Sequence, residues 1–93
     1  MNVVNAGEVW YILARKFSTQ EADQSILELG QLGIQIVAVD WSLTRLAAAF
    51  KRQGKISYAN CFALALAKQK AATLVTGDKE FKAFEREVKI AWL

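Results

Sequence analysis

The sequence predicts an α/β protein in which helices flank a short parallel sheet. Apolar residues recur at helical spacing in several segments, and short runs rich in β-branched residues alternate with these segments. The runs are apolar throughout, which is typical of parallel strands that are covered on both faces. The length of 93 residues suits one small domain, so we expect residues 1–93 to form a single domain.

The first third of the chain predicts two helices. Apolar side chains at helical spacing place the first helix over about residues 2–16. Ser18 and Glu21 then match a capping box, so a second helix should start there. This helix should end near Gly30–Gly33, because glycine tolerates the left-handed conformation of a helix C-cap.

The middle of the chain predicts a strand and two further helices. The β-branched run 34–39 reads as a strand that ends at Asp40. A third helix should start at Trp41 and stop at Gly54. Ser57 is the expected N-cap of a fourth helix, which runs to about residue 70. Its residues are apolar almost all round, so we expect it to be buried on more than one side.

The last quarter predicts a strand over 73–76, a short helix around 80–86 and a third strand over 88–92. Sites in open parallel sheets form at the carboxyl ends of strands. In this chain those ends carry two acidic residues, Asp40 and Asp78.

Composition excludes several classes of protein. With 54% hydrophobic and 23% charged residues, the chain is neither a linker nor disordered. The absence of histidine removes histidine-based catalysis and histidine metal ligands. No apolar run is long enough for a membrane span, and the single cysteine, Cys61, predicts a reducing, cytoplasmic location. The net charge of +3 suits either a polyanionic partner or solubility alone.

Three polar residues stand out, and each allows two interpretations. Asp78 follows a strand and a glycine, so its carboxylate could meet a cation or cap the next helix through the amides of Glu80 or Phe81. Glu8 has apolar neighbours on its helix; it is either buried, and then paired, neutral or metal-bound, or solvated at the edge of the apolar stripe. Asn60 lies on an apolar helix, where its amide either serves a function or is a buried structural group whose hydrogen bonds are satisfied.

Taken together, these segments resemble the PIN domain, most closely that of VapC-type toxins. The resemblance rests on Gly-Glu-Val-x-Tyr, on Ile-Ser-Tyr-Ala-Asn-Cys-Phe-Ala-Leu-Ala, on Leu-Val-Thr-Gly-Asp-x-x-Phe and on a final Val-Lys-Ile strand, and it covers nearly the whole chain. It implies a three-layer fold and an endoribonuclease that hydrolyses RNA phosphodiesters with Mg²⁺ or Mn²⁺. It also implies that Glu8, Asp78 and the Asn60 position are catalytic, that Glu8 and Asp78 bind the metal, and that Thr76 supports the site.

The chain departs from this family pattern in two ways. Asn60 stands where the family has an aspartate, and the chain starts after the family's first strand and its acid. With two of the four expected acids, weak or absent metal binding and impaired nuclease activity are expected. Whether the chain is an enzyme therefore stays open. One alternative is a working nuclease whose missing acids come from another chain or from a lost N-terminal segment. The other is a non-catalytic module that binds an antitoxin or dimerises.

The missing strand also predicts assembly. Without it, strand edges and apolar helix faces are left without a partner. We therefore expect this truncated domain to form a homodimer or a larger homo-oligomer.

Overall fold

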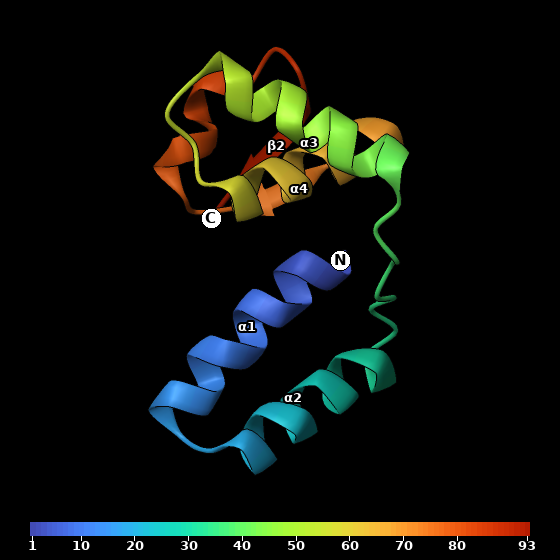
Figure 1. The fold of residues 1–93 in the computed structure, drawn as a ribbon, viewed down its shortest axis with the longest axis vertical. Coiled ribbons are helices and arrows are strands. Elements are labelled where there is room, and N and C mark those ends of the chain that lie inside the picture. Colours follow the sequence, from blue (N-terminus) through green and yellow to red (C-terminus); the bar gives the residue numbers. More distant parts are fainter. The chain divides into compact units, whose positions relative to one another are not determined.

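Four α-helices and one parallel two-stranded sheet make up the computed structural model, which describes residues 1–93 (Figure 1). The predicted α/β class with a short parallel sheet is confirmed. The chain divides into two compact units, Met1–Val39 and Asp40–Leu93. None of its helices combines the length and the apolar character that crossing a membrane would need.

The first unit is a pair of helices, α1 (Val3–Lys16) and α2 (Thr19–Gln31), which lie side by side in opposite directions (Figure 1). The predicted capping residue is confirmed, because Ser18 Oγ accepts a hydrogen bond of 3.0 Å from the backbone N–H of Glu21. Between the helices, the indole N–H of Trp10 donates to Asp23 Oδ1 at 2.8 Å.

The strand predicted over 34–39 is wrong. Only Val37 forms a parallel bridge, and its partner is Asn2. The backbone N–H of Val37 donates to the carbonyl of Met1 at 2.7 Å, and the N–H of Val3 donates back to Val37 at 3.0 Å. Helix α1 already begins at Val3. The chain around Asn2 therefore turns into helix α1 after a single bridge, and a β-ladder of several residues cannot form.

The second unit opens with two packed helices, α3 (Trp41–Gln53) and α4 (Tyr58–Gln69). Asp40, predicted to end a strand, instead caps α3 by accepting the N–H of Leu43 at 2.9 Å. Burial of α4 on more than one side is confirmed, since it contributes several of the unit's buried apolar residues. These residues are Leu43, Ala47, Phe50, Ile56, Cys61, Phe62, Leu64, Ala65, Ala67, Phe81, Phe84 and Val88.

Two three-residue strands complete the second unit, β1 (Leu74–Thr76) and β2 (Ile90–Trp92), and they pair in parallel. Both were predicted, with slightly longer bounds. The short helix between them, η1 (Lys79–Phe84), is a 3₁₀ helix. It places Phe84 against Phe50 in an edge-to-face contact with 5.6 Å between ring centroids. This contact fixes η1 against α3, next to the carboxyl end of β1.

Candidate functional site

The turn after β1 is organised by Thr76. Its hydroxyl oxygen accepts a hydrogen bond of 3.0 Å from the backbone N–H of Asp78. This bond spans two residues and bends the chain sharply at the carboxyl end of the strand. The side chain of Asp78 is thereby placed at the sheet edge where the sequence predicted a site.

Asp78 caps the 3₁₀ helix η1. Of the two roles that the sequence left open for this residue, cation ligand or helix cap, the structure shows the cap. Its Oδ1 accepts the backbone N–H of Glu80 at 2.9 Å. This contact uses only one carboxylate oxygen. The other oxygen, Oδ2, accepts a hydrogen bond of 3.0 Å from the side-chain amide of Asn60. Asp78 therefore caps η1 with one carboxylate oxygen and joins a polar cluster with the other.

The side-chain nitrogen of Asn60 bridges two acidic residues. It donates to Asp78 Oδ2 at 3.0 Å and to Glu80 Oε1 at 3.1 Å. Its backbone N–H in turn donates to Ser57 Oγ at 3.2 Å, which is the N-cap bond of α4. Asn60 is half-buried in the first turn of this helix. The structure thus brings together two of the predicted site residues, Asn60 and Asp78, with Thr76 beside them.

Glu80 is a member of the cluster that the sequence analysis missed. Its Oε1 accepts the backbone N–H of Ser57 at 2.8 Å, in addition to the amide of Asn60. In a capping box, a glutamate three residues after the N-cap accepts this N–H. Here that position is Asn60, and Glu80 supplies the acceptor from another element. The signal was present in the sequence, because Asp78 and Glu80 are two carboxylates on one short turn after a strand.

Glu8 lies on α1 in the first unit and is half-buried there. The other three predicted residues, Asn60, Thr76 and Asp78, lie in the second unit. The participation of Glu8 in one site with them stays a prediction from the family resemblance.

Cys61 lies next to Asn60 on α4 and is fully buried. Burial raises the pKa of this thiol above its ordinary value, since the thiolate would lose its hydration. The positive charge of Lys51 opposes this shift, and the negative charge of Glu80 adds to it. The cysteine is therefore a small apolar core residue behind the polar cluster.

The two units differ in charge. The first has four acidic and two basic side chains, a net charge of −2, whereas the second has ten basic and five acidic ones, a net charge of +5. The mild basicity of the chain is thus concentrated in the unit that carries the Asn60–Asp78–Glu80 cluster. A polyanion would be attracted to this unit.

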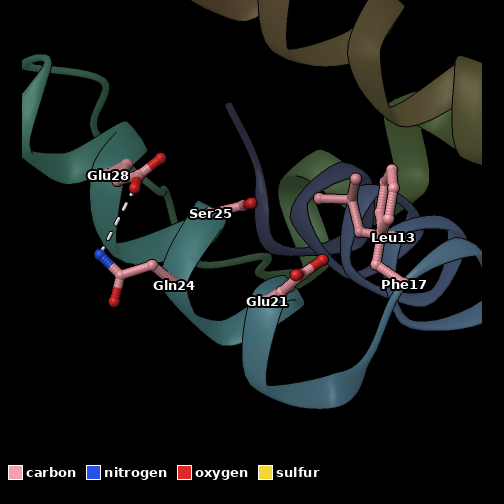
Figure 2. Close-up of a pocket in the computed structure, with 6 residues that line it drawn as sticks. All are labelled: Leu13, Phe17, Glu21, Gln24, Ser25 and Glu28. Atoms are coloured by element: carbon pink, nitrogen blue, oxygen red, sulfur yellow. Dashed lines mark hydrogen bonds between the residues drawn. The ribbon is translucent and has the colours of Figure 1, made fainter.

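The first unit has a groove of its own, with a volume of about 240 Å³. Figure 2 shows Leu13 and Phe17 on one side of it and polar side chains of α2 on the other. Phe17 is 65% exposed although it is a large aromatic residue. The polar side is lined by Glu21, Gln24, Ser25 and Glu28. The groove thus combines an exposed apolar surface with two acidic side chains.

The polar cluster does not fit a divalent cation as it stands. Neither unit gathers three or more acidic, histidine or cysteine side chains in a metal-binding arrangement. The cluster offers two carboxylates, and both accept hydrogen bonds from the same amide nitrogen. Mg²⁺ requires oxygen ligands at about 2.0–2.1 Å, and here an N–H group faces the carboxylate oxygens it would use.

Comparison with protein families gives a match over most of the chain. The model of the PIN domain family matches residues 1–87, which include all of α1 to η1. The comparison with curated proteins found no match, and neither did the comparison with solved structures.

Proposed function

The chain belongs to the PIN domain family, a family of nucleases, and from this membership we propose that it is a VapC-like cytoplasmic ribonuclease homologue with impaired cleavage. RNA is its ancestral substrate, and the carboxylates that would act in catalysis are those of Glu8 and Asp78. Thr76 supports the site by holding the turn that carries Asp78. Asn60 takes the place of a further acid.

One observation carries this proposal: an amide joins two carboxylates at the strand edge of a PIN domain. Hydrolysis in the family depends on a divalent cation, which would neutralise the charge that develops on the phosphate. An amide contributes no negative charge to hold such a cation. The net charge of +5 in the same unit supports RNA binding without cleavage.

The purified chain is expected to bind single-stranded RNA but not to cleave it measurably in Mg²⁺ or Mn²⁺. Binding should weaken as salt is raised, because the attraction comes from basic side chains and the release of counterions. A labelled RNA oligonucleotide reports both properties, by fluorescence anisotropy and by gel. Cleavage that depends on Mg²⁺ and is lost in both Glu8→Ala and Asp78→Ala would contradict the impaired activity.

A second candidate function is protein binding, and the groove between α1 and α2 favours it. The groove presents an exposed Phe17 beside the acidic Glu21 and Glu28. A second copy of the chain suits it, because the second unit is basic and exposes Trp41, which is 72% exposed. The chain would then form a homodimer and act by binding rather than by catalysis. The other candidate partner for this groove is an antitoxin helix that carries basic and apolar side chains.

Light scattering is expected to give twice the 10.4 kDa mass at micromolar concentration. Phe17→Glu should shift the chain to the monomer, because it places a third acidic side chain in the groove and removes the apolar contact. Leu93→Glu, at an exposed residue outside the groove, is the control. A wild-type chain that stays monomeric would contradict dimerisation and leave the groove to an antitoxin.

A further inference from the structure

The amide nitrogen of Asn60 occupies an unusual position between two acidic side chains. Its side-chain nitrogen lies 3.0 Å from Asp78 Oδ2 and 3.1 Å from Glu80 Oε1 and donates to both, and a primary amide has two N–H groups for this purpose. Two carboxylates that lie this close to one group repel each other unless a positive or hydrogen-donating group separates them. In this chain the separating group is a neutral side chain.

The remaining contacts show that the bridge is held from both sides. Asp78 is fixed through its backbone N–H to Thr76 and through Oδ1 to the N–H of Glu80. On the other side, Ser57 accepts the backbone N–H of Asn60 and donates its own N–H to Glu80. The first turn of α4 and the start of η1 are thereby joined through a single closed network.

We propose that the Asn60 amide fills the place between Asp78 and Glu80 that a divalent cation would otherwise take. The two carboxylates at the carboxyl end of β1 are then held together without a metal. The amide and a cation then compete for the same carboxylate oxygens. Asn60 is in this sense a positioning residue, which holds the two carboxylates rather than acting on a substrate. The inference deepens the proposed function and rests on it only for the family's use of a cation at this edge.

The competition predicts how the thermal unfolding midpoint responds to cations. The wild-type chain should have the same midpoint in EDTA and in millimolar Mg²⁺ or Mn²⁺. Asn60→Ala removes the bridge, so Asp78 Oδ2 loses its amide donor and Glu80 Oε1 keeps only the N–H of Ser57. The midpoint of this variant should therefore be lower in EDTA and should rise when Mn²⁺ is added. Asn60→Asp adds a third carboxylate and should show a larger rise, of at least about 4 °C.

The matched controls are Gln53→Ala and Gln53→Glu, which make the same chemical changes at an exposed amide on the last residue of α3. Both should be as insensitive to Mn²⁺ as the wild type. These controls separate binding at the cluster from a general effect of charge on stability.

Binding of Mn²⁺ followed by electron paramagnetic resonance measures the competition directly in the full chain. We expect no binding to the wild type and binding to Asn60→Ala, which an additional Asp78→Ala substitution abolishes. Mn²⁺ binding to the wild type that Asp78→Ala removes would overturn the proposal. So would an Asn60→Ala chain that folds and gains neither binding nor stability from Mn²⁺. Should Asn60→Asp fail to fold in EDTA, its folding in Mn²⁺ would support the proposal, and its failure in both would count against it. None of these measurements depends on RNA cleavage, so the proposed function can fail separately.

Discussion

Leu64→Ala is expected to lower the free energy of unfolding by about 2–5 kcal/mol. Leu64 lies in the middle of α4 and is completely buried. Truncation removes the transfer free energy of its side chain and leaves a cavity that the neighbouring residues fill only in part. The same helix carries Asn60 in its first turn, so looser packing of α4 should also disturb the polar cluster.

Chemical denaturation of the full chain, followed by circular dichroism, measures this effect. Leu93→Ala is the matched control, because it makes the same chemical change at a residue that is 90% exposed. We expect that variant to unfold within about 0.5 kcal/mol of the wild type, as surface substitutions usually do. Equal losses in the two variants would show that α4 is not the centre of the core.

Cys61 is expected to react with thiol reagents at least about a thousandfold more slowly in the folded chain than in the unfolded chain. The thiol is 0% exposed, so a reagent reaches it only when the second unit opens. Its reactive form is the thiolate, and burial raises the pKa of this thiol. Both effects lower reactivity in the same direction.

The raised pKa of Cys61 also fixes the sign of a pH effect on stability. The thiol contributes fully to stability below the pKa that it has in the unfolded chain, and this contribution is lost as pH rises through the folded value. Labelling with a chromogenic disulfide reagent, with and without denaturant, measures the protection. Cys61→Ala should lose the alkaline part of the pH dependence, and rapid labelling of the native wild type would contradict the buried position.

The helices were predictable because their signals are local. Ser18, Asp78 and Ser57 each cap the helix that follows them, and a cap depends only on residues two or three positions away. The two strands of the second unit were predictable for a similar reason, since short β-branched runs bounded by turns favour extended backbone. The 34–39 run carries the same signal but forms one bridge, because strand formation also needs a partner of matching length.

The candidate site divides in the same way. The sequence determined which residue types stand at its positions: Asp78 in a Thr-Gly-Asp turn, and an amide, Asn60, at the position where the family resemblance implies an acid. It did not show that Glu80 joins them, or that one amide nitrogen lies between two carboxylates. Those contacts link residues about twenty positions apart, and only the packing of η1 beside α4 brings them within hydrogen-bond distance. Residue types and helix caps are local properties that can be read from the sequence. The pairing of polar groups that are distant in the sequence is decided by the packing of the core.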